Sequence, residues 1–512
     1  MTPAARSEDQ GNATAPPGND RLLFGMILGV VAFWLFAQTT LNIASTMATD
    51  LGIEMSVMNI AVSITALFSG IFVVIVGGLA DRIGRVKIVQ IGFVFGIVGA
   101  LLVGLAPSGG LATPALMIGR ICQGLSAACI MPASLALVKA YWEGPGRQRA
   151  VSMWSMGSWG GSGFAALFGG LVAQNVGWRW IFVACAGVSI IGMLMVRGTP
   201  ESKVASKGRY EADVKGIATF MVAMIALQLF VTQGGVLGWL SPASVALLAI
   251  AIVVGAVFVR VESGNPKAFV DFRLFRNRTY TGATLSNLLL NAVAGIIIVA
   301  MTLVQVGGGL SAQEAGLLTL GYGIGIVAFI RVGEKLLQRF GARKPMIWGC
   351  LIVAAAILLL IPTNVLLGTY RILVIAAFSL FGIGLAFYAT PSTDAALANL
   401  PDDQSGAGSG IYKMASSLGA SFGVAISAAI FTALSADGSG LNWLPGVLTF
   451  VGRQDNVALR EAAVFAFAAN LLMIVAALVA IVLLVPKGKP GGASPSRRPA
   501  SADGLPGPDP AT

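Results

Sequence analysis

Fourteen long, mostly apolar runs constrain what this chain can fold into more than any other feature of its sequence. Backbone amides inside a lipid bilayer have no water to bond, so a run of about 18 or more apolar residues is expected to cross the membrane as a helix. An even number of crossings places both ends of the chain on the same side. The runs are 22–45, 57–79, 88–106, 114–138, 149–174, 179–197, 214–232, 242–261, 280–306, 314–333, 346–362, 370–395, 406–434 and 461–485.

The composition supports the same conclusion. The 512 residues are 56% hydrophobic and only 11% charged, whereas water-soluble domains average about 25% charged residues. So few charges cannot cover a surface that faces water, so most of the surface is expected to face lipid. The sequence therefore predicts an all-α membrane protein whose main surroundings are the lipid bilayer.

The basic residues lie mostly on one side of the predicted membrane. If the N-terminus is inside, 27 of the 33 Lys and Arg residues fall in inside loops and tails, four fall outside, and Arg120 and Lys413 fall within helices. Loops rich in Lys and Arg stay in the cytoplasm, so this distribution predicts that both termini are cytoplasmic. The net charge of +11 then reflects topology, and no nucleic-acid partner is expected.

The two halves of the chain contain stretches that resemble each other. GGLADRIGRVK at 77–87 recurs in weaker form as EKLLQRFGARK at 334–344, and the segment from Gly124 to Pro132 recurs from Gly382 to Pro391. Two six-helix halves separated by two helices produce such a spacing. Structural repeats of this kind underlie alternating access in secondary transporters, with the substrate site between the halves.

Several stretches resemble motifs of one transporter family. GGLADRIGRVK is similar to the loop between helices two and three of the major facilitator superfamily, and Arg120-x-x-Gln123-Gly124 resembles its helix-four motif. WRWIF at 178–182 and DFRLFR at 271–276 are similar to patterns of its fourteen-helix drug:proton antiporter branch. Longer runs across residues 22–486 look like the NorB-type quinolone and multidrug efflux pumps of Gram-positive bacteria, among them AVSITALFSG, QGLSAACIMPA, GSWGGSG, IRVGEKLLQ and YATPSTD.

The resemblance implies the major facilitator fold, with fourteen transmembrane helices arranged as two six-helix pseudo-symmetric bundles plus two intervening helices. The expected function is proton-coupled export of amphipathic drugs such as fluoroquinolones, quaternary ammonium compounds and dyes by a monomer in the bacterial cell membrane. The expected parts are a disordered cytoplasmic N-tail at 1–21, bundles at 22–200 and 266–486, linking helices with their loops at 201–265, and a disordered C-tail at 487–512.

The charges in stretch 77–87 are candidates for a gate. Its three basic residues oppose translocation of the loop, and Asp81 can lie close to the electropositive N-terminus of a neighbouring helix. The resemblance suggests that this partner is the helix start near 406–410, where a contact would hold the two halves together on the cytoplasmic side. The alternative is a turn that only sets topology. The candidate gating residues are Gly77, Asp81, Arg82, Gly84 and Arg85.

Ionisable groups within the bilayer are costly unless they are paired or hydrated, so they are candidate functional residues. The resemblance implies a role in proton coupling for Arg120. Lys413 and Asp394 have comparable depths in adjacent helices, so we predict an ion pair between them that acts as a protonation-sensitive latch. The alternative is that Asp394 faces cytoplasmic water while Lys413 extends toward the interface.

The chain departs from the antiporter pattern in two places. Ala37 stands where the helix-one pattern carries Asp, and Ala165-Ala166 stand where the helix-five pattern has Gly-Pro. No carboxylate then lies deep in the first half. Proton coupling is therefore expected to use Asp394, Glu334, or the outer-end acids Asp50 and Glu54.

Polar and aromatic side chains in several helices are candidates for substrate contact, because large amphipathic compounds need stacking surface more than a fixed hydrogen-bond pattern. Each amide has the alternative of an interhelical hydrogen bond. The candidates are Trp34, Gln38, Asn42, Trp154, Asn287, Asn291, Tyr322 and Tyr388.

Three other functions compete with drug export. A facilitator or symporter of a native solute, such as a peptide, lipid or organic anion, would suit the missing acids. A structural or sensory membrane protein would need neither Arg120 nor the repeat. An enzyme is disfavoured because the chain has no histidine, and because it lacks the HExxH and P-loop motifs. No cofactor and no metal are expected.

Overall fold

The structure, a computed structural model, describes residues 18–203, 213–263, 265, 268, 270–435 and 456–488. Within these ranges thirteen helices are long and apolar enough to cross a membrane. The remaining predicted run, 149–174, lies in a stretch that is helical from Gly144 to Asn175, but its glycines and serines make it less apolar than the others. The fourteen-helix prediction is therefore consistent with the structure. The predicted disordered tails lie outside the described residues except for 18–21 and 487–488.

The helices of the first half precede a pair of linking helices. The elements of the first half are α1 (Asp20–Val31), η1 (Ala32–Phe36), η2 (Ala37–Thr39), α2 (Thr40–Leu51), α3 (Met55–Ile83), α4 (Arg85–Gly104), α5 (Ala112–Tyr141), α6 (Gly144–Ser155), η3 (Met156–Gly160), α7 (Gly161–Asn175) and α8 (Arg179–Val196). The linking pair is α9 (Val214–Leu237) and α10 (Pro242–Ser263).

The second half follows the same plan. Its elements are η4 (Phe272–Arg276), α11 (Arg278–Ala292), α12 (Gly295–Thr302), η5 (Leu303–Gly307), α13 (Ala312–Leu318), α14 (Leu320–Phe340), α15 (Arg343–Leu360), α16 (Leu367–Ala398), η6 (Asp402–Gln404), α17 (Ser405–Ser435) and α18 (Val457–Leu484). One of its core clusters contains only residues between Leu290 and Val485.

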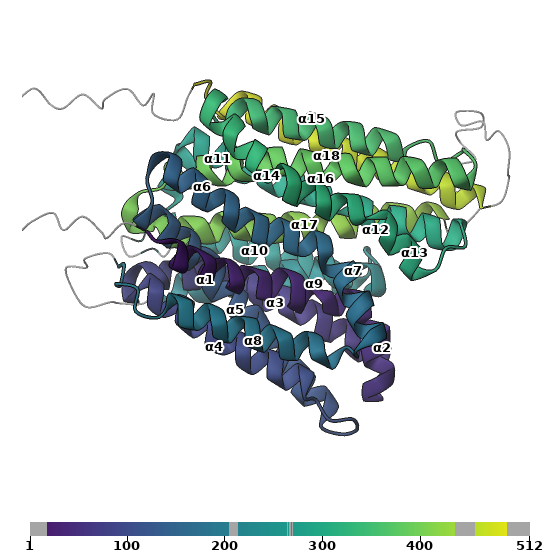
Figure 1. Ribbon diagram of the computed structural model, residues 1–512, viewed down its shortest axis with the longest axis horizontal. Coiled ribbons are helices and arrows are strands. Elements are labelled where there is room, and N and C mark those ends of the chain that lie inside the picture. Colours follow the sequence, from purple (N-terminus) through teal and green to yellow (C-terminus); the bar gives the residue numbers. More distant parts are fainter. Residues whose placement is uncertain are drawn as a thin grey trace, which may run out of the picture.

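The internal repeat is visible in the packing. In the first half α5 packs against α3 and α4, and α4 also packs against α8; in the second half α16 packs against α14 and α15, and α15 against α18. Gly84 ends α3 and Gly341 ends α14, both with positive φ. In Figure 1, α15 and α18 lie along one long edge of the molecule and α4 and α8 along the opposite edge. The pseudo-symmetric two-bundle prediction is confirmed.

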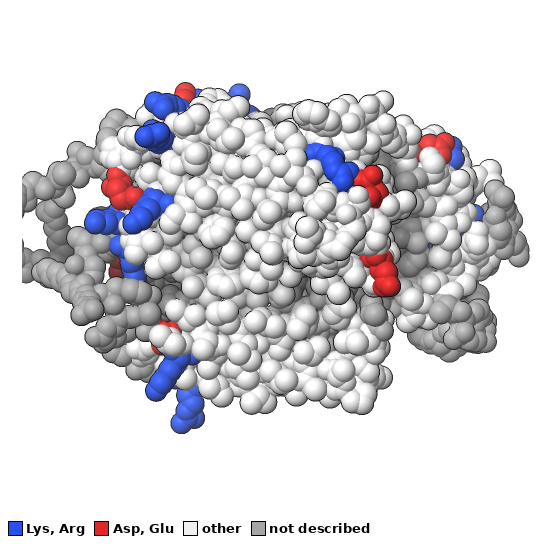
Figure 2. All heavy atoms as spheres, turned by 90° about the horizontal axis from the view of Figure 1, so that it is seen from below, with Lys and Arg blue, Asp and Glu red and all other residues white. Residues whose placement is uncertain are grey.

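Helices α9 and α10 pack against each other, and α9 also contacts α3 and α17, one helix from each half. Figure 2 shows Lys and Arg side chains gathered at one end of the molecule, beside a wide band without charged side chains. We call the end formed by the α3–α4 turn, the α5–α6 turn and the residues that contact them the basic end; it includes Arg82, Arg85, Lys139 and Arg147. The uncharged band is the surface expected to face hydrocarbon.

Candidate functional site

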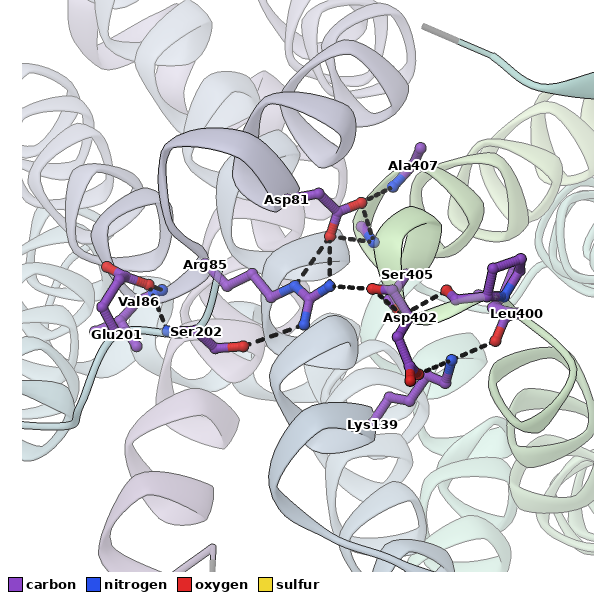
Figure 3. A network of polar contacts seen from close by, with 12 residues as sticks. Asp81, Arg85, Val86, Lys139, Glu201, Ser202, Leu400, Asp402, Ser405 and Ala407 are labelled. Atoms are coloured by element: carbon purple, nitrogen blue, oxygen red, sulfur yellow. Dashed lines mark hydrogen bonds and ion pairs between the residues drawn. The ribbon is translucent and has the colours of Figure 1, made fainter. Parts of the chain in front are cut away.

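Stretch 77–87 forms the end of α3, a turn at Gly84 and the start of α4. Asp81 is only 3% exposed. Its carboxylate accepts hydrogen bonds from the backbone N–H groups of Gly406, at 2.8 and 2.9 Å, and of Ala407, at 3.1 Å (Figure 3). These groups start α17, and a helix N-terminus offers unbonded N–H groups and partial positive charge. The contact joins the two halves at the helix start that the resemblance suggested.

Arg85 extends this contact. Its guanidinium pairs with Asp81 at 2.8 Å and donates to the backbone oxygen of Asp402 at 2.7 Å and to the hydroxyl of Ser202 at 3.1 Å (Figure 3). The carboxylate of Glu201 accepts hydrogen bonds from the backbone N–H groups that start α4. The segment that follows α8 is therefore fixed to the same network. Arg82 is half-buried beside it.

Two glycines allow the helices to come this close. A Cβ atom built on Gly406 would lie 2.2 Å from the backbone oxygen of Gly77, and one built on Gly77 would lie 2.4 Å from the backbone oxygen of Gly406. Contacts this short cannot be accommodated without moving a helix. The backbones of α3 and α17 therefore touch directly, which is how the Asp81 carboxylate reaches the start of α17.

Two further ion pairs join the halves at the basic end. Arg147 of α6 donates from Nε to Oδ1 of Asp394 in α16 at 2.9 Å, with 17% and 4% of the side chains exposed. Lys139 of α5 pairs with Asp402 at 2.8 Å and also donates to the backbone oxygen of Leu400. Sequence reasoning missed Arg147 and Lys139 as partners, because basic residues of inside loops were interpreted only as topology signals.

The predicted Asp394–Lys413 ion pair is wrong. Asp394 faces Arg147 instead. Lys413 is buried between two tryptophan rings, with its Nζ 4.8 Å from the ring centroid of Trp154 and 6.0 Å from that of Trp34. The two residues have similar depths, but residues on adjacent helices meet only if both face the shared side.

Exchanging the charges of Arg147 and Asp394 tests the contact between α6 and α16. Arg147→Asp or Asp394→Arg alone places like charges together and is expected to slow transport at least about fivefold, because charged neighbours couple by about 0.5–3 kcal/mol. The double variant restores the pair and is expected to regain at least about half of the wild-type rate. Initial export rates in membrane vesicles, at matched protein levels, provide the measurement. A double variant as slow as either single variant contradicts a direct pair.

Arg120 is completely buried in the first half. Its Nε donates to the backbone oxygen of Ala61 at 3.1 Å, and its Nη1 donates to the backbone oxygen of Ala37 at 2.8 Å and to Oε1 of Gln123 at 2.6 Å. Ala37 lies where the π-helical segment η1 meets the 3₁₀ turn η2. At the position where the family pattern places Asp, a backbone carbonyl therefore binds the guanidinium. Arg120 Nη2 has no hydrogen-bond partner among the described residues.

The other acids named as coupling candidates have local partners. Glu334 is buried and bonds to Arg331 and Gln338 within α14. Asp50, outside the membrane-spanning segments, binds Arg179, and the hydrogen bond from Arg179 lowers the pKa of the Asp50 carboxyl. A lowered pKa keeps that carboxylate charged at neutral pH, which does not favour Asp50 as a proton carrier.

The residues predicted to contact substrate have different surroundings. Asn287 and Tyr388 are buried and fully engaged within the second half: Asn287 donates to the backbone oxygen of Tyr412 and to Ser416, and Tyr388 bonds to Ser286 and Ser392. They are not available to a substrate in this conformation. Asn291 donates to Oδ1 of Asn287. Both residues lie in α11, so this hydrogen bond is within one helix and not between helices.

The remaining candidates lie nearer the boundary between the halves. Trp34 and Gln38 are half-buried and Asn42 is exposed. The hydroxyl of Tyr322 in α14 lies 3.3 Å from that of Ser162 in α7, across the two halves. Trp154 is buried and meets Lys413 of the other half. The structure therefore brings Trp34, Trp154 and Lys413 together and leaves the rest of the set dispersed.

Comparison with known proteins agrees with this architecture. A family model described as Major Facilitator Superfamily matches residues 23–304 and 283–507. The quinolone resistance protein NorB of Staphylococcus aureus strain MRSA252 is 47% identical over 418 residues, which cover 82% of this chain and 89% of the relative. The NorB of strain bovine RF122 / ET3-1 is 47% identical over 420 residues, again covering 82% and 89%.

Two solved structures share the fold at low sequence identity. The proton:xylose symporter XylE, bound to 6-bromo-6-deoxy-D-glucose, superposes with a TM-score of 0.63 at 17% identity and covers 92% of this chain and 96% of its own. The human organic anion transporter MFSD10 (TETRAN) superposes with a TM-score of 0.60 at 14% identity, covering 91% and 100%.

Two pseudo-symmetric helical halves with charged contacts between them are the architecture of secondary transporters. The family model covers both halves, and the relatives are 47% identical over most of the chain. This chain belongs to the Major Facilitator Superfamily.

Proposed function

We propose that this protein exports amphipathic drugs, such as fluoroquinolones, quaternary ammonium compounds and dyes, across a bacterial cytoplasmic membrane in exchange for protons. The observation that carries the proposal is the 47% identity over 418 residues with a protein named for quinolone resistance. The protein works as a monomer with both termini in the cytoplasm, so the basic end is cytoplasmic.

The contacts at the basic end support an outward-facing state in this conformation. Asp81, Arg85 and Arg147 hold the halves together there. The first candidate span ends at Thr39, and on α2, which follows it, Asn42, Ser45, Thr46 and Thr49 are exposed and follow one another at helical spacing. A polar exposed face at this end of the helix suits contact with water, as expected if the halves are apart there.

The candidates for proton coupling remain Arg120, Asp394, Lys413 and Glu334. The position of Asp394 supports it most directly among the acids, because it is buried and bonded to a residue of the opposite half. Protonation would remove its charge and weaken the pair with Arg147, which would link proton uptake to opening of the basic end.

Inside-out vesicles that contain the protein test the function. An inside-acid pH gradient is expected to drive uptake of a fluorescent fluoroquinolone at least about tenfold faster than in vesicles without the protein, and nigericin, which collapses the gradient, is expected to stop it. Uptake that proceeds equally without the gradient would indicate a facilitator and overturn the antiport. The control without the protein excludes passive partition into lipid.

A further inference from the structure

Lys413 is a buried cation at the boundary between the two halves. Its side chain comes from α17 of the second half and lies against Trp34 of η1 and Trp154 of α6, both from the first half. Lys413 is 5% exposed. Among the residues that the structure describes, no carboxylate pairs with its ammonium group and no hydrogen-bond acceptor reaches it.

Two indole faces compensate this charge only in part. An ammonium group within about 6 Å of an aromatic centroid is attracted by the negative face of the ring, and both distances, 4.8 and 6.0 Å, fall within that range. A buried charge still needs an opposite charge or several hydrogen bonds to offset its lost hydration. The positive charge of Lys413 is therefore not fully compensated, and a bound anion would compensate it.

The second group at this site that could bind an anion is the indole N–H of Trp34. The indole Nε1 of Trp34 is buried without a hydrogen-bond acceptor among the described residues. The indole of Trp154, in contrast, is fixed by a 2.9 Å hydrogen bond from its Nε1 to Ser134. One cation and one unused N–H donor lie beside two flat aromatic surfaces, and the group recognised by such a set is an acceptor attached to an aromatic ring.

We propose that Lys413, Trp34 and Trp154 form a site for the carboxylate of aromatic acids, so that drugs with an aromatic carboxylate are preferred over permanent cations. The ammonium of Lys413 and the indole N–H of Trp34 bind the carboxylate oxygens, and the indole faces bind the ring. This inference rests on the proposed export of amphipathic drugs and narrows its substrate class.

The position of Lys413 also connects such a ligand to the gate. Lys413 lies seven positions after Gly406, whose N–H binds Asp81, and in a helix this offset is about 10 Å along the axis. Because α17 carries both contacts and the tryptophans belong to the other half, an anion bound here bridges the halves close to the contact between Asp81 and the start of α17.

Norfloxacin and its ethyl ester form the matched pair of probes, because both carry the same amine and only the first has a carboxylate. Binding to the purified full-length protein is measured for wild type, Lys413→Gln, Lys413→Arg and Trp34→Phe. Wild type is expected to bind the acid at least about tenfold tighter than the ester, since a charge-assisted hydrogen bond is lost with the ester. Lys413→Gln is expected to bring the ratio close to one, Lys413→Arg to preserve it, and Trp34→Phe to lower it about threefold.

Each outcome decides the inference. A wild-type protein that binds acid and ester equally overturns it, and this result needs no variant to fold. A Lys413→Gln protein that keeps the wild-type ratio overturns it as well. Failure of the export proposal is a different result: neither norfloxacin nor ethidium would then be moved by a pH gradient. Gradient-driven movement of ethidium without any acid preference leaves export standing and removes only the carboxylate site.

Discussion

Replacing Asp81 by alanine is expected to open the basic end and to remove most of the gradient-driven export. The carboxylate carries two kinds of contact, the pair with Arg85 and the hydrogen bonds from Gly406 and Ala407. Removing one partner of a buried ion pair costs about 3–5 kcal/mol. That free energy is lost only from the state in which the halves meet here, which corresponds to a shift of more than about 100-fold in the equilibrium between the two states.

Distances between spin labels measure that shift directly. Lys87 at the start of α4 and Arg339 near the end of α14 are exposed positions on opposite halves. The distance between the two labels is expected to be longer in Asp81→Ala than in the same labelled protein with Asp81 in place. Unchanged distances together with wild-type export would show that Asp81 does not hold the two halves together at the basic end.

Asp402→Ala is the matched control for Asp81→Ala. Asp402 lies in the same network, but its side chain is 99% exposed, and exposed ion pairs contribute about 0–1 kcal/mol. Arg85 binds the backbone oxygen of Asp402, which alanine retains. We therefore expect export within about twofold of wild type for this control, consistent with so small a contribution.

The parts of the fold that follow from local sequence could be predicted. The apolar runs give the helices, and the repeat gives their pairing, since Gly84 and Gly341 end equivalent helices. The contact between Asp81 and the start of α17 could also be anticipated, because a carboxylate and a helix N-terminus attract each other whatever the detailed rotation of the helices.

The side-chain partners across the interface could not be predicted in the same way. Asp394 and Lys413 have similar depths, yet one meets Arg147 and the other meets two tryptophans. Depth along a helix follows from the sequence, whereas the direction a side chain faces depends on how two halves dock. The hydrogen bond that the backbone oxygen of Ala37 accepts from Arg120 could not be predicted either, because every residue type carries the same backbone acceptor.

Arg120 is expected to be the residue whose loss has the largest effect in the first half. Its guanidinium ties the first span, α3 and α5 together through Ala37, Ala61 and Gln123. Arg120→Leu leaves these acceptors without their charged donor, and hydrogen bonds to charged groups contribute about 1.5–3 kcal/mol each. Export is expected to fall at least about 100-fold, which corresponds to the loss of two such bonds.

Two further variants separate charge from geometry at this position. Arg120→Lys keeps the charge, but an ammonium is a compact point charge without the planar, forked donors of a guanidinium, so we expect less than about one tenth of wild-type export, as for one lost charged bond. Gln123→Leu removes a single acceptor and is expected to slow export only about tenfold. Melting temperatures of the purified proteins show whether the losses arise from unfolding. If Arg120→Leu exports as fast as wild type while Gln123→Leu does not, the guanidinium is not the centre of this network, because its acceptors would matter more than the group that binds them.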